Sequence, residues 1–427
     1  MKIPESMLNR VSLYSEKLKD KPKLQRMYRN SYLQTIKTSI KKCDDDSWFV
    51  LTGDIPAMWL RDSTAQITHY VDIAEDPEIA EIIEGVIRKQ FLYIKIDPYA
   101  NAFNERPNGH GHINDIPKND PWVFERKYEI DSLCYPVRLL YLYWKKTGNE
   151  GIINDELESV SRIIIDLWRI EQYHMERSPY RFIRPDVPPD RPYDSIYNNG
   201  MGNPVAYTGM TWSGFRPSDD GCQYGYLIAS EMFAVVALRY MAEMLSEVCN
   251  NTVLANECKQ LANEIDNGIK KYGIINDEKY GEIYVYETDG YGSCLISDDA
   301  NIPSLLSIPY IGYVEADDRI YQNTRKLLLS GDNEFYFEGK FAKGIGSRHT
   351  PKNHIWHMSL VMQGLTSISE KEKTEILDML ANTDGGTYYL HESFNADAPS
   401  DYTREWFTWP NSLFAEFIER CADEGII

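Results

Sequence analysis

Residues 223–245, QYGYLIASEMFAVVALRYMAEML, decide the fold class of this chain. The first half of this segment is apolar nearly all round, so a helix formed here must be buried on both sides. Other helical segments, such as Pro77–Lys95 and Asp131–Lys146, have an apolar face opposite a polar one, which is typical of surface helices. Helices with two buried sides beside helices with one buried side predict two concentric layers.

Hydrophobic periodicity predicts about a dozen helices with a few short strands between them. The predicted helices are Lys23–Lys42, Ala57–Ala74, Pro77–Lys95, Asp131–Lys146, Asn154–His174, Gln223–Leu245, Val253–Lys271, Ala300–Leu306, Asp317–Leu329, Pro351–Leu365, Lys371–Ala381 and Glu405–Arg420. The predicted strands are Trp48–Leu51, Ile283–Tyr286, Glu334–Phe337 and Thr387–Leu390. Two layers of helices in this number predict an all-α (α/α)6 barrel, with residues 1–427 as a single catalytic domain. An α-solenoid is the alternative, but solenoids usually show a sequence repeat and none is evident.

The composition restricts the partners and the compartment. The formal net charge of −20 disfavours binding to nucleic acid and to anionic membrane surfaces. The seven cysteines are odd in number and form no CxxC motif, so we expect reduced thiols. The first residues contain no apolar signal core, and no run is long enough to cross a bilayer. We therefore expect a cytoplasmic protein with no nucleic-acid or membrane partner, and the sequence leaves its oligomeric state open.

A loop-like segment that leads into the apolar helix, residues 209–225, reads GMTWSGFRPSDDGCQYG. The adjacent carboxylates Asp219 and Asp220 lie near Arg216 and several aromatic residues. This combination suits a polar ligand with apolar faces, such as a sugar ring. We expect the acids at the start of a helix, where capping is the alternative interpretation. A general acid here would need burial or the charge of Asp219 to raise its pKa against the helix dipole.

Two further segments concentrate polar and aromatic residues. Residues 52–64, TGDIPAMWLRDST, place Trp59 among charged groups, and a helix-capping network is the alternative interpretation. Residues 344–357, GIGSRHTPKNHIWH, contain three histidines, but their spacing does not match zinc motifs and no cysteine or carboxylate completes a set. We therefore predict no metal, and we interpret these histidines as donors to sugar hydroxyls or as structural residues.

The partner of the first acid is expected in residues 390–410, LHESFNADAPSDYTREWFTWP. Glu392 follows a strand-like run and precedes a predicted helix, in polar and aromatic surroundings; a salt bridge to Arg404 is the alternative. The chain shows no phosphate-binding loop, dinucleotide fingerprint or serine-nucleophile elbow. Two well-separated carboxylates in an aromatic cleft are the equipment of a glycoside hydrolase.

The quoted segments, with SDDANIPSLLSIPYIG at residues 297–312, resemble glycoside hydrolase family 125 from about Trp48 to Ile418. The resemblance implies an (α/α)6 barrel that hydrolyses non-reducing terminal α-1,6-linked mannose from manno-oligosaccharides or N-glycan fragments, with inversion and without a metal or other cofactor. It places the acid at Asp220 and the base at Glu392. The candidate substrate-binding residues are Asp54, Trp59, Arg61, Asp62, Trp212, Arg216, Asp219, Asn301, His349, His354 and Trp409.

Other functions stay open on the residues alone. One is a non-catalytic mannoside-binding protein on the same scaffold. The other is a different inverting (α/α)6 enzyme, such as a glucoamylase-like hydrolase, a disaccharide phosphorylase or a calcium-dependent mannosidase.

Overall fold

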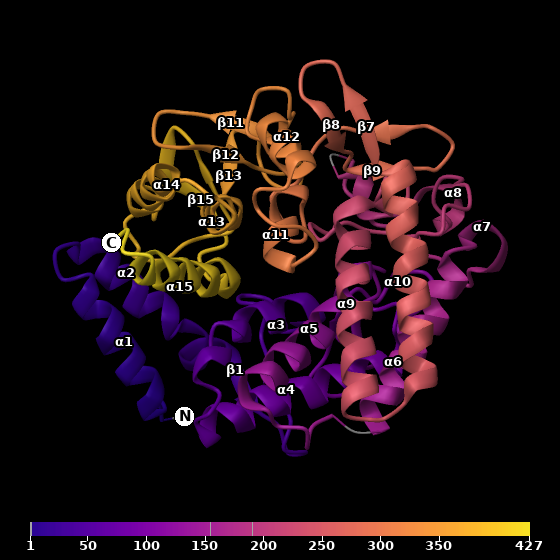
Figure 1. The fold of residues 1–427 in the computed structure, drawn as a ribbon, viewed down its shortest axis with the longest axis horizontal. Coiled ribbons are helices and arrows are strands. Elements are labelled where there is room, and N and C mark those ends of the chain that lie inside the picture. Colours follow the sequence, from indigo (N-terminus) through magenta and orange to yellow (C-terminus); the bar gives the residue numbers. More distant parts are fainter. Residues whose placement is uncertain (1, 154, 190) are drawn as a thin grey trace.

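The computed structural model describes residues 2–153, 155–189 and 191–427, which form two concentric rings of helices (Figure 1). The inner ring consists of α3 (Leu60–Thr68), α5 (Ile130–Thr147), α9 (Ile228–Glu247), α11 (Ile308–Ile311), α13 (His357–Leu365) and α15 (Thr408–Asp423). The outer ring consists of α2 (Pro22–Tyr32), α4 (Pro77–Ile96), α6 (Asp155–Glu171), α10 (Thr252–Tyr272), α12 (Arg319–Leu328) and α14 (Glu370–Asn382). Contacts link the inner helices from α13 through α15, α3, α5 and α9 to α11. The outer helices α4, α10 and α14 pack on inner helices next to them in the chain, while α2 packs on α15 and α6 on α9. The predicted (α/α)6 barrel is confirmed.

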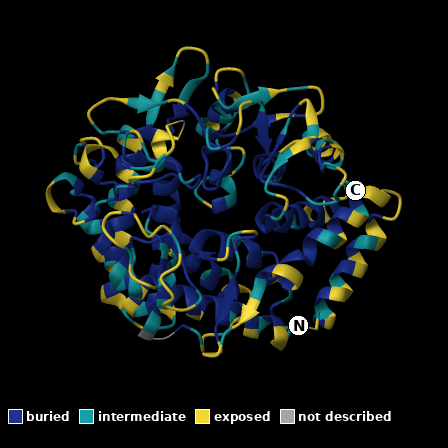
Figure 2. Ribbon diagram, turned by 180° about the vertical axis from the view of Figure 1, so that it is seen from behind, coloured by how far each residue is buried: buried dark blue, intermediate teal, exposed yellow. Residues whose placement is uncertain are grey.

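Burial separates the two rings, as the periodicity predicts for the inner helix α9. The inner helix α5 is an exception: its sequence predicts a surface helix, but residues 130–140 are buried without interruption. Residues 228–238 of α9 are buried without interruption, and so are residues 357–364 of α13. The outer helix α10 instead buries a single stripe that includes Leu254, Leu261 and Ile265. Figure 2 shows the same division, with buried positions gathered at the centre and exposed ones on the rim.

Further helices lie outside the rings: α1 (Glu5–Lys17), α7 (His174–Arg177) and α8 (Tyr197–Gly200). The N-terminal helix α1 packs on α15, which brings the two ends of the chain to the same side of the molecule (Figure 1). Arg10 on α1 forms an ion pair with Glu419 of α15. Tyr28 of α2 donates a 2.7 Å hydrogen bond to the same carboxylate. Charge therefore ties the first two helices to the last one.

Short antiparallel sheets lie at one end of the barrel. Three of those in the described ranges have three strands: β3 (Met58–Trp59), β4 (Ala102–Phe103) and β5 (Val123–Glu125); β6 (Tyr226–Leu227), β9 (Glu287–Thr288) and β10 (Cys294–Leu295); β13 (His354–Trp356), β14 (Ser393–Asn395) and β15 (Ala398–Thr403). The two-stranded pairs are β1 (Ile40–Lys42) with β2 (Trp48–Val50), β7 (Ile274–Asp277) with β8 (Gly281–Tyr284), and β11 (Tyr336–Glu338) with β12 (Lys343–Ile345). The strands β3, β6 and β13 run directly into α3, α9 and α13. The N-terminal ends of these inner helices therefore meet the sheets at one end of the barrel.

Several predicted elements are wrong in extent or type. The predicted helix Lys23–Lys42 ends as α2 at Tyr32, and a π-helical turn and β1 follow it. Ala300–Leu306 contains no α-helix, since the chain there is irregular up to a 3-10 turn at Leu305–Ser307. Thr387–Leu390 forms turns, and the strand of this region is β14. The first residue of the predicted helix Asn154–His174 lies outside the described residues.

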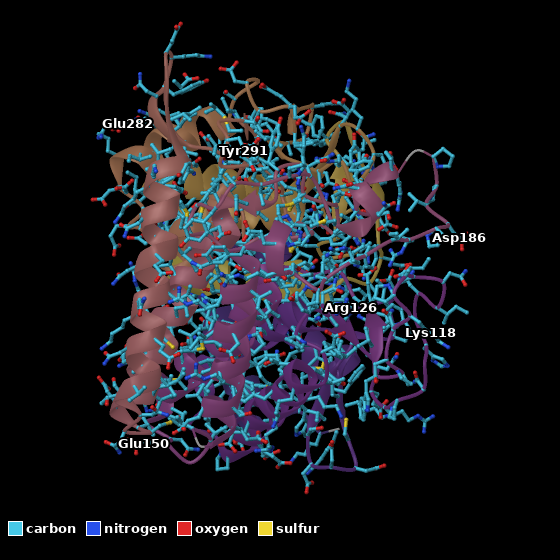
Figure 3. The ribbon with its side chains drawn as sticks, turned by 90° about the vertical axis from the view of Figure 1, so that its right-hand side faces the viewer. Lys118, Arg126, Glu150, Asp186, Glu282 and Tyr291 are labelled. Atoms are coloured by element: carbon cyan, nitrogen blue, oxygen red, sulfur yellow. The ribbon has the colours of Figure 1, made fainter. Side chains whose placement is uncertain are left out.

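Two long irregular segments cover one side of the molecule. Residues 104–121 lie there together with residues 178–189 and 191–196, as the positions of Lys118 and Asp186 in Figure 3 show. A backbone bridge joins Ile116 to Ile183, which couples the two segments. Among the described residues, no helix has the length and apolarity that crossing a membrane would need.

Candidate active site

The sheet-bearing end of the barrel contains two adjoining cavities. The inner one has a free volume of about 30 Å³ and is lined by Thr52, Ile55, Trp59, Arg61, Asp62, Ser218, Asp219, Asn301, His349, Trp356, Glu392, Arg404 and Phe407. The outer one has a volume of about 500 Å³ and is lined by Ile55, Trp59, His112, Phe124, Glu125, Lys127, Arg184, Arg191, Tyr193, Asp194, Asp219, Asp220, Arg348 and His349. The two candidate catalytic carboxylates therefore line different compartments, which share Ile55, Trp59, Asp219 and His349.

The segment with the paired aspartates is a loop held by its own backbone. Asp219 N–H donates to the carbonyl of Arg216 over 2.9 Å, and Arg216 N–H donates to the carbonyl of Asp220 over 2.8 Å. This turn puts Asp219 at φ +69°, a left-handed conformation that is uncommon for a residue with a side chain. The helix α9 begins only at Ile228, with Leu227 as its N-cap residue and no side-chain cap. The capping interpretation of the two aspartates is therefore wrong.

Asp220 is 7% exposed and faces positive charge. Its carboxylate lies 3.4 Å from Nε of Arg348 and 3.7 Å from Nδ1 of His349. Burial raises the pKa of Asp220, but His349 and the guanidinium groups of Arg348 and Arg216 outweigh it, so the pKa lies below its ordinary value. The expectation that Asp219 keeps this acid protonated is therefore wrong, because cations dominate its surroundings.

His349 carries the proton that Asp220 lacks. Burial lowers the pKa of its imidazole, but contact with Asp220 and the nearby charges of Asp219 and Glu392 raise it to about 9. The ring is therefore an imidazolium at neutral pH, placed among three carboxylates. It lines both cavities, so its charge acts on each of them.

Glu392 immediately precedes β14 and is 8% exposed. The hydroxyl of Thr403 donates a 3.0 Å hydrogen bond to its Oε2, and Nη1 of Arg404 lies 3.6 Å from its Oε1. The salt bridge that the sequence left as an alternative is therefore present, and it coexists with a place on the cavity wall. Arg404 also forms an ion pair with Asp54, so Asp54 reaches the site only through this arginine.

A buried group of charges lies beneath the inner cavity. Arg61 is 2% exposed and forms ion pairs with Glu129 and Asp131, both of which are fully buried. Burial raises the pKa of Asp62 to about 6, against the lowering effect of Arg61 and Arg404, and also raises the pKa values of Glu129 and Asp131. The guanidinium of Arg61 is thus occupied largely by protein carboxylates.

The comparisons with known proteins agree with this geometry. The sequence profile of the metal-independent α-mannosidases, glycoside hydrolase family 125, matches residues 21–419. The chain belongs to this family. A solved metal-independent α-mannosidase from Streptococcus pneumoniae, in a non-productive complex with α-1,6-mannobiose, is 43% identical with a TM-score of 0.96, over 99% of this chain and 100% of that one.

Two further matches have lower sequence identity to this chain. The meiotically up-regulated gene 157 protein of Schizosaccharomyces pombe is 38% identical over 94% of this chain and 83% of its own length. A bacterial glucoamylase solved with acarbose matches 85% of this chain and 49% of its own at 14% identity and a TM-score of 0.55. At that identity the likeness shows a shared barrel fold and nothing about substrate.

The structure of this GH125 enzyme brings only some of the predicted binding residues to the cavities. Those that line one or both are Trp59, Arg61, Asp62, Asp219, Asn301 and His349. The predicted residues that line neither are Asp54, Trp212, Arg216, His354 and Trp409.

The predicted residues that miss the cavities have structural partners. Trp212 stacks on His174 with ring centroids 3.7 Å apart, and Trp409 packs in the core against Tyr135. Arg216 is fully buried and donates a 2.6 Å hydrogen bond to Glu287. None of these three predicted binding residues reaches a cavity wall, because each side chain is buried among protein contacts.

Other residues on the cavity walls were not predicted as ligands of the substrate. They include Arg404, Trp356, Lys127 and Arg348. Arg348 is adjacent to His349 in the histidine segment, and Arg404 was considered only as the partner of Glu392. Lys127 could not have been found, because it comes from a segment without a motif.

The described residues contain no group of three or more histidine, cysteine, aspartate or glutamate side chains arranged to hold a metal ion. The carboxylates of Asp62, Asp220 and Glu392 each lie within 4 Å of an arginine or histidine nitrogen.

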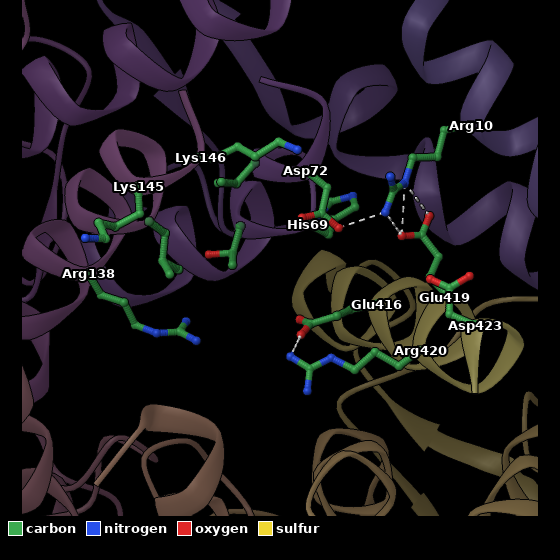
Figure 4. A pocket seen from close by; sticks show the side chains of 13 residues that line it. Arg10, His69, Asp72, Arg138, Lys145, Lys146, Glu416, Glu419, Arg420 and Asp423 are labelled. Carbon is green, nitrogen blue, oxygen red and sulfur yellow. Dashed lines mark hydrogen bonds and ion pairs between the residues drawn. The ribbon is translucent and has the colours of Figure 1, made fainter. Parts of the chain in front are cut away.

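Another cavity of about 500 Å³ lies at the opposite ends of α3, α5 and α15 (Figure 4). Some of its charges pair with one another, Arg10 with Asp72 and Glu419, and Arg420 with Glu416. Others, such as Lys145 and Lys146, pair with carboxylates outside the lining. Basic residues at helix C-termini offset the negative end of the helix dipole. Neither candidate catalytic carboxylate lines this cavity, so we place the active site at the sheet-bearing end.

Proposed function

We propose that the protein is an inverting exo-α-1,6-mannosidase that removes non-reducing terminal mannose from manno-oligosaccharides or N-glycan fragments. One observation carries the proposal: Asp220 and Glu392 line two adjoining compartments that share four wall residues. An inverting glycosidase needs its two carboxyl groups on opposite sides of the scissile bond with room for water between them. The relative solved with α-1,6-mannobiose supports the choice of linkage.

In this mechanism Asp220 is the general acid and Glu392 the general base. Asp220 gives a proton to the glycosidic oxygen, while Glu392 takes one from a water that attacks the anomeric carbon from the other face. The bond from anomeric carbon to leaving-group oxygen breaks as the bond to water oxygen forms. The hydrogen bond from Thr403 to Oε2 restricts rotation of the Glu392 carboxylate and thereby fixes the direction of Oε1.

The proton of the acid is held jointly by Asp220 and His349. Protonated His349 beside ionised Asp220 holds the same number of protons as neutral His349 beside protonated Asp220. The pair can therefore supply one proton in either state. Transfer from His349 to Asp220 would form the acid, and a sugar oxygen that excludes water would favour the uncharged pair. The raised pKa of His349, about 9, keeps this proton in place at neutral pH.

The terminal mannose is expected where the two cavities meet, because the inner one, at about 30 Å³, is too small for a whole sugar ring. There Trp59 can contact a sugar face, while Asp62 and Asn301 can accept or donate hydrogen bonds to hydroxyl groups. The rest of the outer cavity then takes the leaving group.

A cytoplasmic location is part of the proposal. Cys43, Cys134, Cys222, Cys258, Cys294 and Cys421 are free thiols. Free cysteines in this number fit a reducing compartment.

The anomer first released from α-1,6-mannobiose tests the mechanism. Proton NMR of the first minutes of reaction should show β-mannose, and initial α-mannose would refute inversion. Asp220→Asn and Glu392→Gln should each lower turnover at least a hundredfold while mannobiose binding, measured by calorimetry, persists. Phosphate-dependent release of mannose 1-phosphate would identify a phosphorylase instead.

A further inference from the structure

The loop that presents Asp220 depends on contacts from elsewhere in the chain. The left-handed backbone of Asp219, at φ +69°, is unfavourable for a residue other than glycine. Such a conformation persists only where its surroundings hold it. Each backbone group near the turn should therefore have an identifiable partner.

Most of these partners belong to the loop or to the segment next to it. The turn is closed by the two hydrogen bonds between Arg216 and the aspartates. Gly221 N–H donates a 2.7 Å hydrogen bond to the carbonyl of Tyr193, in the irregular segment on the outer cavity. The carbonyl of Asp219 itself accepts from a side chain, the ammonium of Lys127, over 2.8 Å.

Lys127 is placed for this contact and is almost entirely buried, at 2% exposure. Its Nζ also binds Asp194, the residue after Tyr193, and lies 3.8 Å from Glu125. Burying an ammonium is costly unless charged and polar oxygens surround it. Here those oxygens connect the cavity wall to the peptide between Asp219 and Asp220.

We propose that Lys127 is a positioning residue for the general acid, acting through the Asp219 carbonyl on the orientation of Asp220. The proposal rests on the proposed function. Lys127 lines the outer cavity and is absent from the inner one, so it does not share a cavity with Glu392. Loss of its hydrogen bond should relax the turn and misdirect the acid, while the base and the attacking water keep their places.

A purely structural role is the competing explanation, since Lys127 also neutralises Glu125 and Asp194. Arg184 offers a matched control. It lines the same cavity and forms ion pairs with Asp115, Glu125 and Asp194. It makes no hydrogen bond to the described residues of the loop that carries the candidate acid. Removing Arg184 disturbs the same acidic cluster without removing the donor to Asp219.

The test uses two substrates that differ in their need for an acid. Departure of a sugar from α-1,6-mannobiose requires protonation, whereas 2,4-dinitrophenolate leaves from its α-mannoside without it. In Lys127→Met, kcat for mannobiose should fall about a hundredfold, the cost of a misplaced catalytic group. The kcat for the dinitrophenyl mannoside should fall less than about threefold. The ratio of kcat for the dinitrophenyl mannoside to kcat for mannobiose should therefore rise more than tenfold.

The remaining variants separate the explanations. Arg184→Met should change both rates by the same factor, and Lys127→Gln, which keeps a donor without the charge, should give a ratio nearer to wild type than Lys127→Met. Thermal unfolding of each variant reports on folding, and Lys127→Gln decides the test if Lys127→Met does not fold. A ratio within twofold of wild type in both Lys127 variants would overturn the positioning role. The same flat ratio in Asp220→Asn would instead overturn the proposed acid.

Discussion

Removing the charge of Asp220 should strip His349 of its proton near neutral pH. Contact with Asp220 makes the largest contribution that raises the pKa of His349 to about 9, while burial lowers it. In Asp220→Asn the raising contribution is lost and the burial effect stays. The pKa should therefore fall toward or below the ordinary value of about 6.5.

The expected change is large enough to be decisive. At pH 8 a group with a pKa of 9 is about 90% protonated, and a group with a pKa of 6.5 is about 3% protonated. Protein labelled with ¹³C at the histidine ring carbons would report this through the Cε1 chemical shift between pH 5 and 10. The chain has 8 histidines, and His349→Asn identifies the signal by its disappearance.

Two outcomes would refute the reasoning. A wild-type His349 that titrates below pH 7 would show that the imidazolium does not persist beside Asp220. If the pKa of His349 stays near 9 in Asp220→Asn, another carboxylate must raise it. Glu392→Gln is the matched control and should lower the pKa of His349 by less than Asp220→Asn does. Asp220 and His349 also determine how activity depends on pH. The kcat/KM should fall as pH rises through about 9, because the proton needed by the acid is then lost.

Two other predictions concern the frame of the site and its independence of metals. Glu287→Ala should lower the free energy of unfolding by about 3–5 kcal/mol in urea, because it leaves the fully buried Arg216 without its ion-pair partner; a loss under about 1 kcal/mol would mean that water enters to solvate the arginine. Prolonged dialysis against EDTA should leave kcat on α-1,6-mannobiose unchanged, and recovery of a lost activity on adding Ca²⁺ would contradict the metal-independent mechanism.

The double ring of helices could be predicted because burial on two sides leaves a clear mark on a sequence. The largely apolar first half of α9 and the single apolar stripe of α10 are visible in the sequence without coordinates. The starts of the inner helices could not be predicted as well. The predicted helix Pro351–Leu365 begins only at His357, because β13 runs straight into it and Trp356 provides no side-chain cap. The usual signal for a helix start is absent at these junctions.

The candidate acids could be predicted from local composition, but their electrostatic partners could not. Asp220 and Asp219 are adjacent in the sequence, yet His349 and Arg348, from 128 to 129 residues away, dominate the surroundings of Asp220. The same limit applies to Trp212: an aromatic residue in a polar loop can face a ligand or the core, and only the fold decides.

The neighbours of the two carboxylates supply an argument for their roles that is independent of any resemblance. Asp220 lies beside His349, an imidazolium that can pass its proton to the carboxylate, whereas Glu392 lies beside Arg404, which stays charged at any physiological pH. A general acid needs access to a proton, and a general base needs a neighbour that cannot supply one. Exchanging the two roles would put the acid next to a group unable to protonate it. The placement of one histidine and one arginine therefore favours Asp220 as the acid and Glu392 as the base.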